Sequence, residues 1–313
     1  MIDVPESGGV EISAGAGQPQ RPMSVRKPVV YAHLLDGVTE STFGLRVTLG
    51  AGSFVEHYPP ATITGTTLEW PTIVAHAAHC DPAAAAARRT APARMACAST
   101  DGICEIDELP RYDAPSTACL DVGTTDSSAL LFYRGQAPSA ALPITATRAA
   151  DLTLTVAGRE PISGVPGGLI RLSTAMSGPW PIGRVVITRA AFPGVGQSVA
   201  MPVGSEVITR EQGIAALRTS IVALGLTDDE ASAFMAGWAD ELFGADTAAR
   251  EATRDLPARG AVYDAGSRHQ DVLLFFLSPS AIDAITTLTP TPAPRAVRRA
   301  FLVRIDLGAV TTA

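Results

Sequence analysis

The segment from residue 211 to residue 243 constrains the fold more than any other part of this chain. Gly225 ends its first half, where a left-handed residue commonly terminates a helix, and the preceding apolar residues have helical spacing: Ile214, Leu217, Ile221 and Leu224. In the second half Thr227 and Glu230 have the spacing of a capping box, and an apolar stripe follows: Phe234, Trp238 and Leu242. The pattern predicts a helical hairpin that buries Trp238 and around which the other elements pack.

Most of the remaining chain has the pattern of β-strands. Short apolar or alternating runs, bounded by Gly, Pro and polar residues, occur at 28–34, 43–49, 54–58, 67–75, 129–134, 151–156, 168–172, 184–188, 271–277 and 299–307. The proline-rich residues 290–294 predict a stiff extended connector. We therefore expect an α+β fold, mostly antiparallel β-sheet in a sandwich-like arrangement, with one helical hairpin and a disulfide-bearing loop insertion.

Composition along the chain suggests three parts. Residues 1–24 are rich in Gly, Pro, Ser and Gln and predict a flexible leader. Residues 25–160 predict a β-rich domain that is interrupted by a Cys-containing insertion at 76–125. Residues 161–313 predict an α+β region that contains the helical hairpin at 211–243.

The overall composition excludes several classes of protein. With 46% hydrophobic and only 18% charged residues among 313, the chain can bury a substantial core. No apolar run is long enough to span a membrane. The net charge is −7 and the arginines are scattered, so nucleic acid is not an expected partner. The sequence leaves the oligomeric state undefined.

The four cysteines lie close together in loop-like surroundings: Cys80, Cys97, Cys104 and Cys119. An even number in such a cluster favours two disulfide bonds. Cys97 and Cys104 enclose a Ser-Thr-Asp-Gly turn that brings the chain ends together, so we expect them to form one bond. Cys80 and Cys119 then form the second bond, which closes the longer loop around the first.

Disulfide bonds persist in oxidising compartments, so the cysteines predict an extracellular or periplasmic protein. Residues 1–9 contain no basic region and no apolar run, and therefore do not form a signal peptide. Two alternatives follow: a signal was removed from this chain, or the protein is cytosolic and its thiols are reduced. The cysteine pattern favours the first alternative.

A zinc site is the alternative use of the cysteines. His76 and Cys80 would share one face of a helix, His79 lies between them, and a later cysteine would complete a tetrahedron. This spacing fits no common zinc motif and leaves Cys119 without a role, whereas two disulfide bonds use every cysteine. We therefore expect no metal and no cofactor, and name His76 and His79 as the ligands if zinc binds.

Residues 97–108 partly match a calcium-binding loop. Asp101 and Gly102 would occupy its fifth and sixth positions, and Glu108 its twelfth. Cys97 stands where the first ligand should be, however, and no flanking helices are evident. A disulfide-closed acidic turn is the simpler interpretation, and Asp101 and Glu108 stay secondary metal candidates.

His269, with Asp264 and Asp271 close in sequence, is the most hydrolase-like group of side chains. A histidine can act as a base when a carboxylate fixes its tautomer. No Gly-x-Ser-x-Gly motif supplies a nucleophile, so a polar turn before the strand at 271–277 is the simpler interpretation.

The tryptophans are the candidates for a surface on which sugars stack. Trp238 lies at a core-facing helical position, and Trp70 falls within a predicted strand. Trp180 lies in a loop rich in Pro and Gly, and is the best candidate for an exposed, ligand-facing ring.

Several landmarks in a shared order resemble a family of uncharacterised, often envelope-associated bacterial proteins. Members open with a Lys-Pro-Val-Ile-Tyr-Leu-Tyr-Pro type segment, to which residues 27–31 are similar, and carry a Leu-Phe-Trp-Glu-Gly type segment, which resembles residues 131–135. The helical residues 224–238 are the most similar part, and residues 290–301 are similar to a Pro-x-Pro stretch that leads into a strand. The resemblance implies an envelope location but no known activity.

We expect an extracytoplasmic, non-enzymatic protein that binds a glycan or a protein partner at the cell envelope. One alternative is a hydrolase that uses His269 or the His76/His79 cluster. Another is a structural surface component that self-associates. A pocket in which carboxylates and histidine converge would favour catalysis, whereas an exposed aromatic strip would favour binding.

Overall fold

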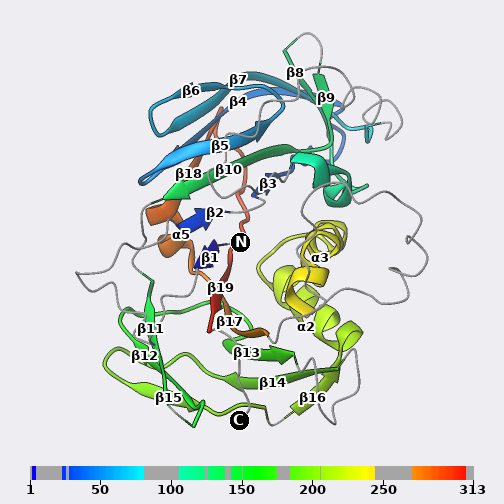
Figure 1. Ribbon diagram of the computed structural model, residues 1–313. Helices are drawn as coiled ribbons and strands as arrows, with labels where there is room; N and C mark the ends of the chain where they lie inside the picture. Colours follow the sequence, from blue (N-terminus) through cyan, green and yellow to red (C-terminus); the bar gives the residue numbers. More distant parts are fainter. Residues whose placement is uncertain are drawn as a thin grey trace.

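The computed structural model describes most of the chain, and every structural statement below concerns the described residues. These are residues 2–4, 23–25, 28–80, 106–123, 126–137, 142–149, 151–174, 184–204, 206–243 and 270–307. They form an α+β fold that consists mostly of antiparallel β-sheet, as predicted from the sequence. Figure 1 shows an upper and a lower β-rich half, with the helical hairpin on one side between them.

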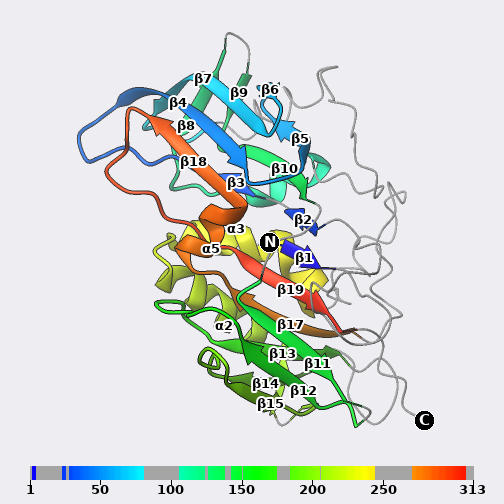
Figure 2. The ribbon, with the colours of Figure 1, turned by 90° about the vertical axis from the view of Figure 1, so that its left-hand side faces the viewer.

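A ten-stranded sheet runs through both halves. Its order is β16 (Glu206–Thr209), β14 (Arg184–Ala190), β13 (Leu169–Thr174), β17 (Gln270–Phe276), β19 (Leu302–Asp306), β1 (Ile2–Val4), β2 (Met23–Val25), β10 (Leu131–Ala137) and β3 (Val29–Val30), and β5 (Ser53–Tyr58) also pairs with β10. Neighbouring strands are antiparallel except β1 and β19, which are parallel. Strands β1 and β2 therefore join the lower part of the sheet to the upper part (Figure 2).

The upper half is a sandwich. A six-stranded sheet has the order β18 (Thr286–Thr291), β4 (Glu40–Leu49), β7 (Thr67–His76), β8 (Cys119–Val122) and β9 (Asp126–Ser128), with β6 (Thr62–Thr64) paired to β7. Its inner face packs on β10, because inward residues of β4 and β7 form one buried cluster with Leu131 and Tyr133. Trp70 lies in this cluster, is fully buried, and donates from Nε1 to the carbonyl of Pro59 at 3.0 Å. Trp70 is thus a core residue.

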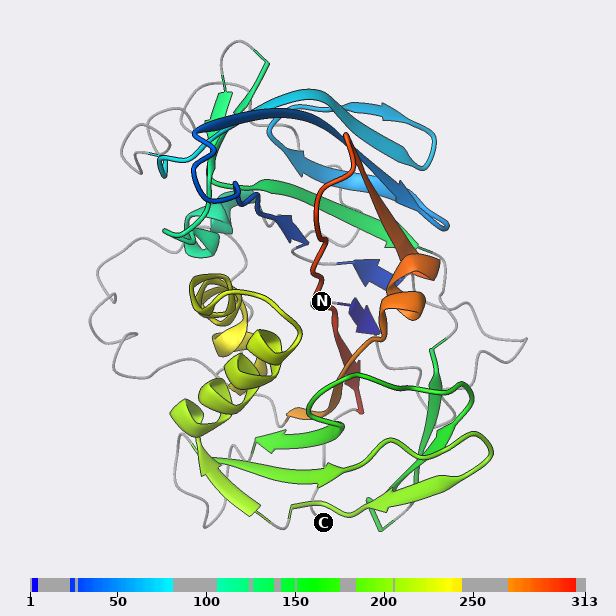
Figure 3. The ribbon, with the colours of Figure 1, turned by 180° about the vertical axis from the view of Figure 1, so that it is seen from behind.

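The lower half has apolar cores on both faces of the β13–β17–β19 region. One face packs against the three-stranded sheet of β11 (Ile144–Arg148), β12 (Leu154–Gly158) and β15 (Ser198–Met201), and against α5 (Pro279–Ile285). The other face packs against α2 (Arg210–Ala223) and α3 (Asp228–Phe243). Figure 3 shows both helices on one side of β13, β14 and β16.

The helical hairpin matches its prediction in detail. The backbone N–H of Thr227 donates to the Glu230 carboxylate at 2.7 Å, and the N–H of Glu230 donates to the Thr227 hydroxyl at 3.2 Å, which is the capping box. Gly225 has φ of 97°, the left-handed conformation expected after the first helix. Trp238 has no exposed surface and lies in the core between the helices and the sheet.

Several strands differ from the sequence-based assignments. β1 lies within the predicted leader and β2 overlaps its end, and β8 extends the upper sheet into the predicted insertion. Pro290 belongs to β18 instead of a connector. β18 pairs only with β4 among the described strands, and proline is tolerated at such an edge because it need not donate to the ladder.

Besides β1 with β19, two further strand pairings cross the predicted boundary at residue 160. β18, near the C-terminal end, pairs with β4 of the upper half. β12, before the boundary, pairs with β15 after it. Among the described helices, none combines the length and hydropathy that a membrane crossing requires.

Candidate functional site

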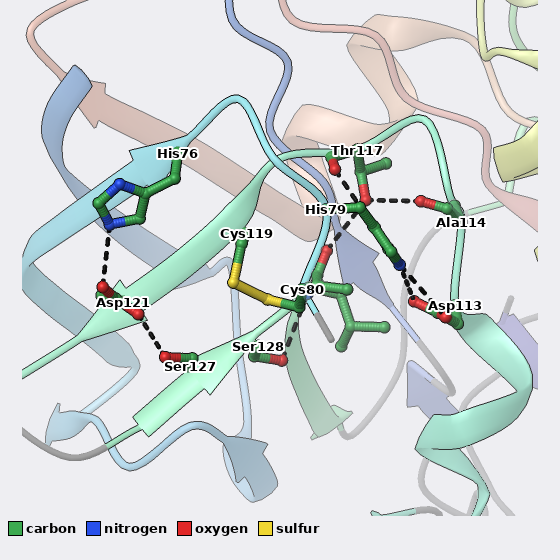
Figure 4. The surroundings of a disulfide bond; sticks show 12 residues. His76, His79, Cys80, Asp113, Ala114, Thr117, Cys119, Asp121, Ser127 and Ser128 are labelled. Atoms are coloured by element: carbon green, nitrogen blue, oxygen red, sulfur yellow. Dashed lines mark hydrogen bonds and ion pairs between the residues drawn. A yellow bond between two sulfur atoms is a disulfide. The ribbon is translucent and has the colours of Figure 1, made fainter. Parts of the chain in front are cut away.

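A disulfide bond joins Cys80, which follows β7, to Cys119, the first residue of β8. The two Cα atoms are 4.6 Å apart, and the cysteines are separated by 39 positions in sequence. The backbone N–H of Cys119 also donates to the carbonyl of Ala78 at 3.1 Å. The predicted pairing of Cys80 with Cys119 is therefore present, and it fixes the segment before β8 against the end of β7 (Figure 4).

The disulfide removes Cys80 and Cys119 as zinc ligands, since only a thiolate can bind the metal. His76 and His79 lie on different sides of the disulfide (Figure 4). His76 Nε2 is 2.9 Å from Asp121 Oδ2, whereas His79 Nε2 is 3.2 Å from Asp113 Oδ1. Within the described ranges, no group of three or more His, Cys, Asp and Glu residues has a metal-binding arrangement. The zinc alternative is wrong for Cys80 with these histidines.

Ser127, Asp121 and His76 resemble a catalytic triad in composition but not in order. The Ser127 hydroxyl donates to Asp121, and the same carboxylate lies beside the His76 ring (Figure 4). A nucleophilic serine must instead give its proton to the histidine. His76 is also 3.5 Å from the Glu40 carboxylate on β4. This cluster is thus a set of cross-strand polar contacts at the end of the upper sheet.

A second histidine cluster lies where the N-terminal end of α3 meets the upper half. We call it the α3 junction, defined by Tyr31, His33, Asp113, Ser116 and Glu230. His33 Nε2 lies 3.0 Å from Glu230 Oε1, and the His33 side chain is 41% exposed whereas that of Glu230 is 10% exposed. The Ser116 N–H donates to Asp229 at 3.1 Å, so the loop before β8 also contacts α3.

The pKa values of His33 and Glu230 shift in opposite directions. The hydrogen bond to Glu230 raises the pKa of His33 above its ordinary value, although partial burial opposes the shift. Burial favours the neutral form of Glu230, but hydrogen bonds from His33 and Thr227 outweigh it and lower the pKa of this carboxyl. Both shifts favour the charged forms of the two residues, and therefore an ion pair between them.

Tyr31 links the α3 junction to the segment that contains Tyr112. Its hydroxyl donates to the carbonyl of Tyr112 at 2.6 Å. Burial raises the pKa of Tyr31, and the nearby carboxylates of Glu230 and Asp113 raise it further, so the phenol stays protonated. Tyr112 belongs to the 3₁₀ helix η1 (Ile106–Tyr112), which lies next to α3 in Figure 1. A Cβ atom at Gly237 of α3 would be 2.1 Å from the Tyr112 ring, so only glycine permits this approach.

A pocket of about 250 Å³ opens beside the α3 junction. It is lined by residues 33–38, and by Ala77, Ser116 and Ala118. Leu35 and Val38 are 55% and 39% exposed, respectively, so apolar side chains flank the opening.

The His33–Glu230 pair resembles a base and its orienting carboxylate, but its geometry favours a fixed charge. A base needs one ring nitrogen that is free to accept a proton. A hydrogen bond with the backbone of Ser116 favours the protonated ring, as the Glu230 contact does. These contacts favour the protonated form of His33, so the His33–Glu230 pair is a structural contact between α3 and the upper half.

Of the other predicted site residues, Asp271 has a structural role and most of the rest lie outside the described part of the chain. Asp271 is fully buried and accepts two hydrogen bonds from Arg171, so it is not available to orient a histidine. The contacts of Asp271 thus indicate a structural role, and the hydrolase alternative stays a prediction. Several candidates lie outside the described residues: Cys97, Cys104, Asp101, Trp180, Asp264 and His269. Glu108 lies in η1 and only its backbone is described.

Sequence reasoning missed the α3 junction. Glu230 was assigned to the capping box alone, and His33 carried no pattern of its own. The two residues are 197 positions apart, and no local signal connects them. Comparisons of the chain with protein-family models, with curated proteins and with solved structures find no match. The resemblance to envelope-associated proteins therefore stays a prediction.

Proposed function

We propose that this chain is an extracytoplasmic, non-enzymatic protein that binds a protein partner at the cell envelope. One observation carries the proposal: Leu35 and Val38 expose apolar side chains on a short loop beside the pocket. Exposed apolar residues grouped next to a concave surface commonly mark an interaction site. The Cys80–Cys119 disulfide supports the extracytoplasmic location, because such bonds persist in oxidising compartments.

The type of exposed side chain favours a protein over a glycan. Sugar rings stack on exposed aromatic faces. In the described part of the chain the large exposed apolar residues are all aliphatic: Leu35, Val38, Ile63, Val195, Val203, Val207, Val222 and Val297. Aliphatic groups contribute to the apolar centre of protein interfaces.

The location is tested by blocking thiols in cells of the producing organism before lysis. Cys80 and Cys119 should resist alkylation until a reductant is added, and intact mass gives the count. Alkylation of both residues without reductant would contradict an oxidising location. This test is independent of what the protein binds.

Binding is tested by immobilising the full chain and exposing it to envelope extract of the same organism. We expect wild type to retain a protein that the Leu35→Ser/Val38→Ser variant does not retain. Ile63→Ser is the matched control, since Ile63 is also 43% exposed but lies on β6. Equal retention by all three forms would contradict a binding site at the loop. Retention of the chain itself would instead support the self-associating alternative, and turnover of hydrolase substrates would support the enzymatic one.

A further inference from the structure

We propose that residues 35–38 and the adjoining pocket receive a basic side chain, Arg or Lys, from an apolar segment of the partner protein. This inference rests on the proposed function and names the chemistry of the partner. It follows from the shape of the loop, the charge around the pocket and the size of the pocket.

Residues 35–38 form a turn that is held in one shape. The N–H of Val38 donates to the carbonyl of Leu35 at 3.0 Å, and Gly37 has φ of 80°. A Cβ atom at Gly37 would meet no atom within 4 Å, so the tip of the turn stands clear of the molecule.

Backbone hydrogen bonds anchor the chain on both sides of this turn. The Ala118 N–H donates to the Ala32 carbonyl at 2.9 Å, and the Ala77 N–H donates to the Thr39 carbonyl at 2.9 Å. The Cys80–Cys119 disulfide fixes the segments that carry Ala77 and Ala118. A loop anchored in this way loses little conformational entropy when a partner binds.

Asp36 supplies a negative charge at the pocket. Asp36 lines the pocket and makes no hydrogen bond or ion pair within the part of the chain that the structure describes. His33, which also lines the pocket, is paired with the Glu230 carboxylate, and the Asp229 carboxylate accepts a hydrogen bond from the backbone of the lining residue Ser116. The residues described as lining the pocket contain neither Lys nor Arg. A cationic group is therefore the complementary partner, and the net charge of −7 favours its approach.

The dimensions fit one side chain. Small-molecule sites usually enclose about 300–1,000 Å³, and this pocket of about 250 Å³ is smaller. The head of an Arg or Lys side chain can pair with Asp36, while its methylene stem covers Leu35 or Val38. Apolar neighbours of that residue in the partner would contact the rest of the exposed turn.

The experiment uses a displayed library of random dodecapeptides, selected on the full oxidised chain. We expect enriched peptides to carry Arg or Lys next to apolar residues. Their synthetic forms should bind Asp36→Asn about tenfold more weakly than wild type, as for loss of one charge-assisted contact. Glu160→Gln removes the same charge from an exposed site in the lower half and should leave affinity unchanged.

Three outcomes would overturn the inference: enrichment of acidic or uncharged peptides, equal affinity for wild type and Asp36→Asn, or no enrichment. If the peptides bind Asp36→Asn and Leu35→Ser/Val38→Ser as tightly as wild type, they bind elsewhere on the protein. That result would contradict this inference but not a general protein-binding role. The retention experiment with envelope extract decides that role separately. Reduced Cys80 and Cys119 in cells would contradict only the location.

Discussion

Asp271 on β17 accepts two hydrogen bonds from the guanidinium of Arg171 on β13, at 2.9 Å from Nε and 2.5 Å from Nη2, and both side chains are buried. Ser173 also donates to Asp271 at 2.9 Å, and Arg171 donates to the Met201 carbonyl on β15 at 2.6 Å. The pair therefore links the ten-stranded sheet to the three-stranded sheet. Removal of one partner from such a buried pair strongly lowers the stability of the fold, because the other charge is left buried without compensation.

We predict that Arg171→Met destabilises the protein by about 3–5 kcal/mol, because it leaves the Asp271 carboxylate buried without its main partner. Denaturant unfolding measures this loss. The double variant Arg171→Met/Asp271→Leu should recover a substantial part of it, since it removes both charges. Equal stability of the single and double variants would contradict this account.

The helical hairpin should depend on Trp238. Trp238→Ala is expected to cost about 3–5 kcal/mol, the range for truncating a large buried aromatic side chain. Val222→Ala on α2 is the control: its side chain is 37% exposed, and the expected change is within about 0.5 kcal/mol. Thermal and denaturant unfolding of both variants test the difference, and an unchanged melting temperature for Trp238→Ala would place this residue outside the core.

The His33–Glu230 pair predicts a pH dependence of stability. Because the pKa of His33 is raised, its contribution is complete below about pH 6.5 and is lost as pH rises through the folded-state pKa. Because the pKa of Glu230 is lowered, its contribution is present above the unfolded value of 4.5 and is lost as pH falls through the folded-state pKa. The pair should therefore contribute most between these two values.

The corresponding measurement compares melting temperatures of wild type and His33→Asn from pH 4 to pH 8. The difference should be largest near pH 5–6 and should shrink towards pH 8, with a maximum below about 1 kcal/mol because His33 is partly exposed. In a Glu230→Gln background, which keeps a capping side chain, replacing His33 should have little effect at any pH. A difference that is constant across pH would show that the two residues are not coupled.

The Cys80–Cys119 bond should stabilise the upper half. Loop-closure entropy for cysteines 39 positions apart gives a stabilisation of about 2–4 kcal/mol. Cys80→Ser/Cys119→Ser should lose this amount in denaturant unfolding. Addition of a reductant should lower the stability of wild type. A variant in which Cys97 and Cys104 are also replaced by serine contains no cysteine, so a reductant should leave its stability unchanged. A variant as stable as wild type would contradict the prediction.

Local signals predicted the helical hairpin, whereas the buried charges depend on contacts that are distant in sequence. The capping box and the Trp238 stripe each lie within a few turns of helix, so their pattern is visible in the sequence. Arg171 and Asp271 are 100 positions apart, and Glu56 and Arg134, which form a second buried ion pair at 3.3 Å, are 78 apart. An arginine in a strand is ordinarily expected to face solvent. The acidic partners of Arg171 and Arg134 can be identified only once the strands are paired in the folded structure.

The same distinction applies to the site. The Cys80–Cys119 pairing was predictable because it depended on a count and on spacing within one segment. The α3 junction was not, because His33 and Glu230 meet only when the upper half packs against α3. The turn at residues 35–38 was also missed, since exposure of Leu35 and Val38 depends on how the surrounding segments pack.

The order of strands in the ten-stranded sheet has a consequence for synthesis on the ribosome. β1, the first described strand, is paired with β19, the last, and β19 also lies against β17. The connection between the two halves through β1 and β2 therefore cannot close until residues 302–306 have left the exit tunnel. Until then the edges of β1 and β17 that β19 covers are open to pairing with other chains, so the unfinished chain is exposed to aggregation at these two strands.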